Sequence, residues 1–420
     1  MINTQNNTAA VIKTIQKQLL GKKLTYKEIY QLMDEIAHER LSDILTTYFV
    51  ASSFKEGFSS EDLYHFTKAM VQTGARLHFK GIIADKHSIG GLPGTRASMI
   101  VVPIIVAAGF KMPKISSRAI TTPAGTADVM EVLAKVEFTP SQLEDIVNTT
   151  GGCVCWNGHL GLAPADDIII RVEEPLSFES FDKIIVSIMA KHVAAGSTHI
   201  IIDLPVGKTM KVRHEKDAQA VLKKFQTLGK RFGIKIIGNI THTNEPAGNG
   251  IGPALEARDV LGVLEQKKDR PLQLEKRALD LSAKLLDLCY EDARIKKDGY
   301  TEAKNILLSG RARAVFMQIL EAQEGNCNIT SDTLVIPSKK YAVKAIYEGT
   351  VKAVNNYNLN SIARLLGAPK DQYAGVYLHK KIGDTVSLHE KELTFYSSSS
   401  YKLKEAIDTL QMFPIYIIEK

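Results

Sequence analysis

The 420-residue sequence has few cysteines and no long apolar run. Its four cysteines, Cys153, Cys155, Cys289 and Cys327, are too few and too scattered for a disulfide framework, which favours a reducing compartment. The longest apolar run, Met99–Phe110, is shorter than the roughly 20 residues that a membrane helix needs, and the polar N-terminus does not resemble a signal peptide. We therefore expect a cytoplasmic protein.

Blocks of like charge are absent as well. The 53 Lys and Arg residues and 46 Asp and Glu residues give a net charge of +7, spread along the chain, which argues against nucleic acid and membranes as partners. Metal-ligand spacing is also missing. Cys153-Val154-Cys155 has no second pair and no suitably spaced histidine, so we expect buried cysteines and no metal site of this kind.

What is present is the composition of a globular chain, with 45% hydrophobic and 24% charged residues. Thr25 and Ser59 are each followed three residues later by an acidic residue and then by apolar residues at helical spacing, which predicts helices before residue 80. Short runs such as Ile82–Ala84 and Ile200–Leu204 then alternate with helical patterns, which is typical of a parallel sheet. From about Tyr341 the runs are β-type again.

The densest set of polar residues follows the first predicted strand, in Asp85–Ser98. Its three glycines let backbone amides approach a ligand, Lys86 supplies charge, and the loop leads into a helix N-terminus, where amides and the helix dipole favour an anion. These features fit a phosphate, and the alternative is a flexible surface loop. Neither the dinucleotide-binding nor the P-loop glycine spacing occurs in it.

A second loop, Ser116–Asp128, again places hydroxyls and one arginine just before a predicted helix. Thr126 as the N-cap of that helix is the alternative, purely structural interpretation. Lys208 and Lys211 follow the strand at Ile200–Leu204, at the end where parallel sheets place ligands. They are therefore further candidates for holding an anion.

Four motifs, in the same order along the chain, resemble those of the thymidine and pyrimidine-nucleoside phosphorylase family. They are Asp85-Lys86-His87-Ser88 with Gly90-Gly91, the Ser116–Asp128 loop, Leu162-Ala163-Pro164-Ala165-Asp166, and Ser187-Ile188-Met189-Ala190-Lys191. The amino-acid sequence of the second loop most resembles the branch of the family that includes AMP phosphorylases and putative thymidine phosphorylases. That branch usually has an extra N-terminal domain, which we expect this chain to lack.

The resemblance implies an α/β fold with a small all-α domain and a C-terminal α+β domain, a nucleoside phosphorylase class II-like architecture. We expect a helical domain of residues 1–79 plus about 165–195, an α/β phosphate-binding domain of residues 80–164 plus 196–335, and a C-terminal domain of residues 336–420. Phosphate and base would then lie on opposite walls of a cleft whose closure assembles the site. A homodimer is the family expectation.

The resemblance also implies site residues. Phosphate-binding positions of the family match Lys86, Ser88, Ser98, Ser116 and Thr126. Substrate-binding positions match Gly91, Arg118, Thr122, Ser187, Lys191 and Lys211, and Arg171 is a further substrate-binding candidate. For catalysis we expect His87 to pass a proton or to orient the sugar, and Lys191, or Glu179 if burial raises its pKa, to serve the departing base. The alternative for His87 is a hydrogen-bonded histidine without a chemical role.

One position departs from the thymidine phosphorylases. Glu173 stands where they have an arginine that contacts the pyrimidine, and Arg171 lies two residues earlier. A carboxylate accepts a hydrogen bond from an amino group or a ring N–H but donates none to a carbonyl, so pyrimidine specificity is less secure.

The leading hypothesis is phosphorolysis of thymidine or another pyrimidine nucleoside by inorganic phosphate, giving free base and (deoxy)ribose 1-phosphate. The near alternative is an AMP phosphorylase that releases ribose 1,5-bisphosphate, and a more distant one is an inactive anion-binding relative. Inorganic phosphate is the expected co-substrate, and we expect no required cofactor. Some relatives hold potassium, for which Glu256 is the matching residue.

Overall fold

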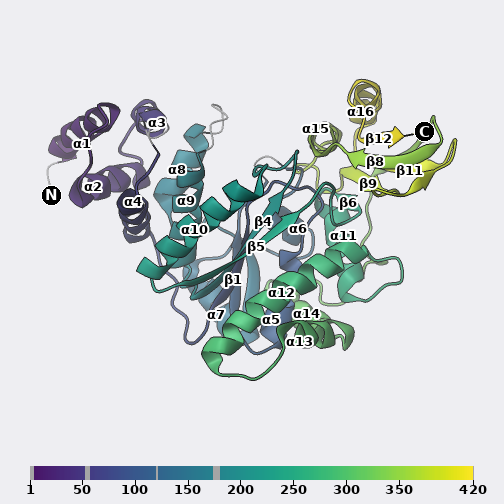
Figure 1. The fold of residues 1–420 in the computed structure, drawn as a ribbon, viewed down its shortest axis with the longest axis horizontal. Coiled ribbons are helices and arrows are strands. Elements are labelled where there is room, and N and C mark those ends of the chain that lie inside the picture. The colour runs from purple at the N-terminus through teal and green to yellow at the C-terminus, as the bar shows by residue number, and fades with distance from the viewer. Residues whose placement is uncertain (1–3, 53–56, 120–121, 174–179, 420) are drawn as a thin grey trace.

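The structure, a computed structural model, describes residues 4–52, 57–119, 122–173 and 180–419. Figure 1 shows a helical lobe at the N-terminal end, a central sheet with helices around it, and a β-rich lobe at the C-terminal end. This arrangement confirms the predicted fold class, an α/β protein with a small all-α domain and a C-terminal α+β domain.

The helical lobe combines two separate stretches of the chain. Its helices are α1 (Thr4–Leu19), α2 (Tyr26–Ala37), α3 (Asp43–Ser52), α4 (Ser60–Gln72), α8 (Pro164–Glu173) and α9 (Phe181–Ala194). Both predicted capping boxes are present, because the Thr25 and Ser59 hydroxyls accept the backbone N–H three positions on, at the starts of α2 and α4. Ile29 and Phe66 share one apolar core with Ile185 of α9, which joins the two stretches.

Parallel strands form the central α/β lobe. They are β1 (Ala84–Ser88), β2 (Met112–Ser116), β3 (Gly152–Trp156), β4 (His199–Val206) and β5 (Lys235–His242). One sheet has the order β1-β4-β5, β2 pairs with β3, and a bridge between Ile83 and Lys111 connects the two groups. The carboxyl ends of parallel neighbours lie at one edge of a sheet, which is where ligands bind in open α/β folds.

Helices bury both faces of this sheet. They are α5 (Ser98–Ala107), α6 (Thr126–Glu131), α7 (Pro140–Thr150), α10 (Glu215–Arg231), α11 (Pro253–Leu264), α12 (Leu272–Ala293), α13 (Gly299–Leu308) and α14 (Arg311–Ala322). Successive β4 side chains point to opposite faces: Ile201 joins the core formed with α5, α12 and α14, whereas Ile202 joins the core shared with α10 and the helical lobe. After its first residue, Ser98, the helix α5 is apolar throughout its 10 residues and lies in the core. No described helix is long and apolar enough to cross a membrane.

The position of the first strand differs from its prediction. The sequence predicts a strand at Ile82–Ala84 with a loop after it, but β1 runs from Ala84 to Ser88, so Lys86 and His87 lie on the strand itself. The prediction is wrong because Asp85 and Lys86 are buried in ion pairs with distant residues, and a hydrophobicity pattern assigns such charges to a loop.

The C-terminal lobe shares a sheet with the central one. It contains β7 (Lys339–Lys344), β8 (Gly349–Val354), α15 (Asn356–Leu366), β9 (Gly375–Leu378), β10 (Thr385–Val386), β11 (Lys391–Ser397), α16 (Ser400–Met412) and β12 (Tyr416–Glu419). The short strand β6 (Gly250–Ile251), which precedes α11, pairs with β9 in the sheet β6-β9-β11-β7. This pairing fixes the C-terminal lobe beside the carboxyl edge of the central strands.

Candidate functional site

A cleft of about 1460 Å³ opens at the carboxyl ends of β1 and β4, and all three lobes line it. One wall consists of β1 and the loops before α5 and α6, and a second of α8 and α9. One face of α15 forms a third wall, which no sequence motif predicted. Most small-molecule sites measure roughly 300 to 1,000 Å³, so this cleft has room for two co-substrates.

Lys86 is the central cation of the first wall. It is 4% exposed, and its Nζ lies 3.7 Å from Oδ2 of Asp203, which Arg277 also holds through bonds of 2.8 and 3.0 Å. Burial lowers the pKa of Lys86 to about 8; Asp203 opposes this, while Arg277, Lys114 and Arg96 lower it further. Lys86 and Arg277 share one carboxylate, which leaves a net positive potential that favours an anion.

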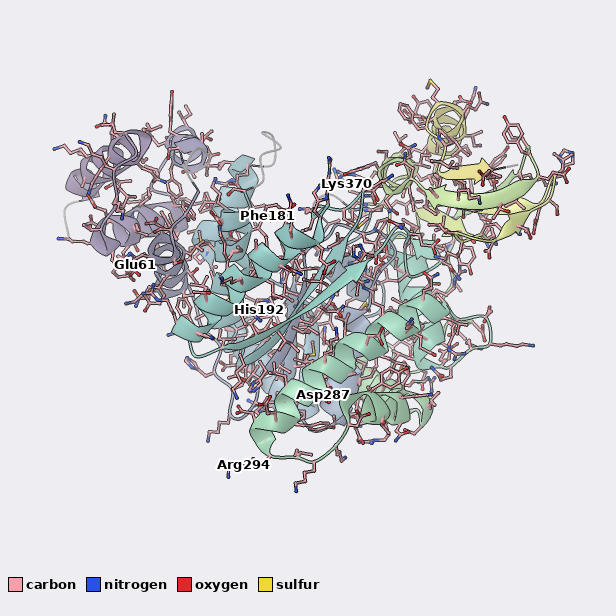
Figure 2. The ribbon with its side chains drawn as sticks, in the orientation of Figure 1. Glu61, Phe181, His192, Asp287, Arg294 and Lys370 are labelled. Atoms are coloured by element: carbon pink, nitrogen blue, oxygen red, sulfur yellow. The ribbon has the colours of Figure 1, made fainter. Side chains whose placement is uncertain are left out.

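Asp85, the residue before Lys86, connects this wall to β2 and α9. Its Oδ1 accepts a 2.9 Å bond from Lys114 of β2, and its Oδ2 lies 2.7 Å from Nδ1 of His192. Burial raises the pKa of Asp85, but Lys114 and His192 outweigh it and hold that pKa well below its usual range. Figure 2 shows His192 beside the central strands, so its contact with Asp85 joins α9 to β1.

His87 is the next member of this chain of contacts. Its Nδ1 lies 3.2 Å from Nε2 of His192. Burial, His192 and Lys114 together hold the pKa of His87 well below 6.5, so the imidazole is neutral at neutral pH. A neutral imidazole keeps one ring nitrogen as a hydrogen-bond acceptor. His87 is thus better suited to orienting a hydroxyl than to supplying a proton.

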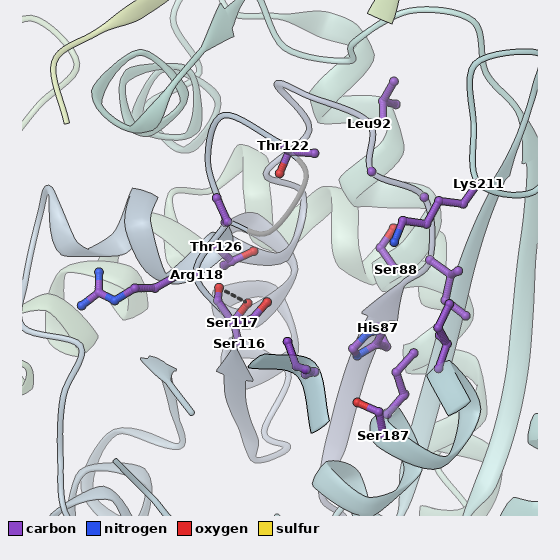
Figure 3. A pocket seen from close by; sticks show the side chains of 18 of the residues that line it. His87, Ser88, Leu92, Ser116, Ser117, Arg118, Thr122, Thr126, Ser187 and Lys211 are labelled. Carbon is purple, nitrogen blue, oxygen red and sulfur yellow. Dashed lines mark hydrogen bonds between the residues drawn. The ribbon is translucent and has the colours of Figure 1, made fainter. Parts of the chain in front are cut away.

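The predicted hydroxyls and loop residues line the same cleft as Lys86, and Figure 3 shows Ser88, Ser116, Thr122 and Thr126 in this pocket. Those lining the cleft are Ser88, Gly91, Ser98, Ser116, Thr122 and Thr126. Ser88 donates a 3.0 Å bond to Asp203, and the Thr122 hydroxyl bonds the Ala124 carbonyl. The N-cap of α6 is Gly125, so the interpretation of Thr126 as that cap is wrong.

The opposite wall carries three polar residues at helical spacing on α9: Lys183, Ser187 and Lys191. Lys191 lies 2.7 Å from Asp166 and 3.7 Å from Asp167 of α8, and Ser187 donates a 2.8 Å bond to Asp166. Burial alone would lower the pKa of Lys191, but these two aspartates raise it above its usual value, so the lysine stays charged.

Glu173 and Arg171, at the end of α8, differ in whether they line the cleft. Glu173 lines the cleft, where its Oε1 accepts a 2.7 Å bond from Lys183. Arg171 is exposed outside the cleft lining and pairs with Asp43 at 3.2 Å, so it does not take the place of the missing arginine in this conformation. Glu179 lies outside the described residues.

Arg118 and Lys211 also line the cleft. The Arg118 guanidinium, however, points away from Ser116 in Figure 3 and pairs with Glu131 and with Glu137 at 3.0 Å. Lys211 belongs to the loop after β4, and Thr209 of this loop accepts a 2.9 Å bond from the buried Asn356 at the start of α15. The loop is therefore fixed against the third wall, whose cleft-lining residues include Asn360, Ser361 and Arg364.

Lys114, Asp203, Arg277 and His192 are the site residues that no sequence motif indicated. Lys114 and Asp203 are single charges inside apolar strands, Met112–Ser116 and His199–Val206, and such isolated charges are a usable signal. His192 and Arg277 lie on helices, and their partners are more than seventy positions away in sequence. No local pattern reveals such pairs.

Family models match most of the chain. Residues 80–312 match the a/b domain of the glycosyl transferase family, residues 12–74 match its helical bundle domain, and residues 350–413 match the pyrimidine nucleoside phosphorylase C-terminal domain. The first of these matches covers the strands that carry Lys86 and Ser116 and the helix that carries Lys191.

Curated relatives carry two kinds of name. AMP phosphorylase 1 of Archaeoglobus fulgidus is 38% identical over 94% of this chain and 78% of its own length, and AMP phosphorylase of Thermofilum pendens is 42% identical over 94% and 76%. A "Putative thymidine phosphorylase" of Bradyrhizobium diazoefficiens is 42% identical over 90% and 73%.

Among solved structures, anthranilate phosphoribosyltransferase from Thermus thermophilus has a similar fold, with a TM-score of 0.61 at 15% identity, covering 74% of this chain and 99% of the other. The predicted resemblance is confirmed by the family models and the curated relatives together. The chain belongs to the family of phosphorylases, glycosyl transferases of the pentosyltransferase type, that includes the AMP phosphorylases and the thymidine phosphorylases.

Proposed function

We propose that this protein cleaves the N-glycosidic bond of a nucleoside with inorganic phosphate, releasing a free base and a pentose 1-phosphate. The observation that carries the proposal is that Lys86 and Lys191 line one cleft from opposite walls. Lys86, among the predicted hydroxyls, suits a phosphate, and Lys191 suits a base that leaves with negative charge. Between the two walls there is room for a sugar.

In this reaction a phosphate oxygen bonds to the anomeric carbon, while the carbon–nitrogen bond breaks and its electron pair goes to the base. Lys86 holds the phosphate, and the protonated Lys191 stabilises the charge that develops on the base. The neutral His87 accepts a hydrogen bond from a sugar hydroxyl and so orients the ring. The departing base takes its proton from Lys191 or from solvent.

A nucleoside monophosphate such as AMP is the second candidate, and the third wall favours it. Arg364 of α15 and Lys211 line the same cleft as Lys86, so a second phosphate group would meet further positive charge. Glu173 can accept a hydrogen bond from an exocyclic amino group such as that of adenine. The products would then be free base and ribose 1,5-bisphosphate.

The test is to incubate the protein with phosphate and thymidine, uridine, cytidine, AMP or CMP, and to measure the released base. Release from nucleosides supports the first candidate, and release from monophosphates alone supports the second. Arg364→Gln distinguishes them further. This substitution should raise the KM for AMP about fivefold, because one exposed contact between opposite charges is lost. The KM for nucleosides should not change. No release from any compound would contradict both candidates.

A further inference from the structure

The loop after β1 carries a buried arginine to which the proposed reaction assigns no role. The Nε of Arg96 donates to Oε2 of Glu256 on α11, and its Nη1 lies 3.4 Å from the Thr126 hydroxyl. The two charged side chains are only 11% and 1% exposed. Arg96 therefore connects the loop before α5, the start of α6 and the start of α11 in one buried contact.

Glu256 is the residue that matches a potassium ligand of some relatives, but its surroundings here do not fit a metal cation. One carboxylate oxygen accepts from Arg96, and the other accepts the Gly252 N–H at 3.1 Å. Potassium in proteins needs several oxygens that replace its water shell. In the segment before α11, the Pro246 and Gly248 carbonyls accept hydrogen bonds from the ammonium of Lys381, at 2.8 and 2.6 Å. Within the described residues, no three His, Cys, Asp or Glu side chains gather in a metal-binding group.

Arg96 also acts on the phosphate wall. It lines the cleft with Thr126, and its charge is one of those that lower the pKa of Lys86. A guanidinium at this place contributes positive potential to the same pocket and holds two anion-binding loops in register. Both effects would be lost together if it were removed.

We propose that the Arg96 guanidinium is the resident cation of the phosphate site. It neutralises Glu256, positions Thr126 and the loop before α5, and makes an external potassium ion unnecessary at Glu256. Arg96 is thus a positioning residue for the bound phosphate. The inference rests on the proposed function only in naming phosphate as the anion of this site.

The experiment measures phosphate affinity by calorimetry and Tm by thermal unfolding, in potassium, sodium or tetramethylammonium chloride at equal ionic strength. Wild-type affinity and Tm should not depend on the cation. Arg96→Met should weaken phosphate binding about tenfold or more, because a charged hydrogen-bonded pair is lost. Potassium, but not tetramethylammonium, should then restore part of the affinity and raise Tm. In Arg96→Met with Glu256→Gln, where no charge is left unpaired, potassium should have no effect.

Arg270→Met is the matched control, since Arg270 forms a similar pair with Glu275 away from the cleft lining. It should leave phosphate affinity unchanged. The proposal is overturned if wild type needs potassium for phosphate binding, if Arg96→Met binds phosphate as wild type does, or if potassium restores the single and double variants equally. A protein that binds phosphate as expected but releases no base from any substrate would contradict the proposed function and leave the role of Arg96 standing.

Discussion

The buried Lys86 and the half-buried Lys191 lie on opposite walls of this cleft, and the charges around them differ in sign. Lys86 has one carboxylate at 3.7 Å, shared with Arg277, and other cations around it. Lys191 has two carboxylates, at 2.7 and 3.7 Å. Burial disfavours the charge on both, yet the pKa of Lys86 is lowered to about 8 while that of Lys191 is raised. The charged neighbours therefore decide the direction of each pKa shift, because burial alone would lower both pKa values.

The different charges around the two lysines indicate which wall binds an anion. The Lys86 wall has uncompensated positive charge, so it gains most when an anion arrives. On the opposite wall, Asp166 and Asp167 already compensate the charge of Lys191. Lys191 therefore keeps its proton and can donate a directed hydrogen bond. One wall is therefore suited to an incoming phosphate and the other to a leaving group, although both present a lysine to the same space.

The largest effect is expected from removing Lys86, which tests whether its wall binds phosphate. Lys86→Ala should lower kcat/KM about a thousandfold, because a preorganised charge at the attacking group is lost. Initial rates over a range of phosphate concentrations measure this. Lys208→Ala is the control, since Lys208 is exposed in the nearby loop after β4 but is not among the cleft-lining residues. A Lys86 variant within a few-fold of wild type would show that the phosphate wall is assigned wrongly.

Removing Lys191 should have a smaller and different effect. Lys191→Met should lower kcat about a hundredfold, as expected when a hydrogen-bond donor to a leaving group is lost, with phosphate affinity nearly unchanged. A substrate with a more acidic base should lose less, because its base leaves more easily without help. Comparing kcat for two such substrates with calorimetric phosphate affinity tests this. A loss of phosphate affinity equal to that of Lys86→Ala would mean that the two walls are not distinct.

The comparison also shows what the sequence reveals. Helix α9 (Phe181–Ala194) lies within the stretch of about 165–195 that was predicted to join the helical domain. Motif resemblance identified Lys86, Ser187 and Lys191, which all line the cleft. The isolated charge of Asp203 was a usable signal, but its pairing with Arg277 was not predictable, because the two residues meet only after folding. The opposite pKa shifts of the two lysines depend on those tertiary contacts, so no sequence pattern could have given them.

The smallest expected effect is on pH dependence, and it applies to Lys86 alone. Below its pKa of about 8 the lysine is charged and holds an anion; as pH rises through that value the charge and the affinity are lost. Anion affinity should therefore fall about twofold at pH 8 and about tenfold per unit well above it. Lys191, with its raised pKa, should contribute no titration in this range. Sulfate is the better probe, because its charge does not change over these pH values, whereas that of phosphate does. Calorimetry with sulfate should show the decline in wild type and a flat, weaker affinity in Lys86→Ala. The same decline in both proteins would place the titrating group elsewhere in the cleft, and the contrast between the two lysines would lose its functional meaning.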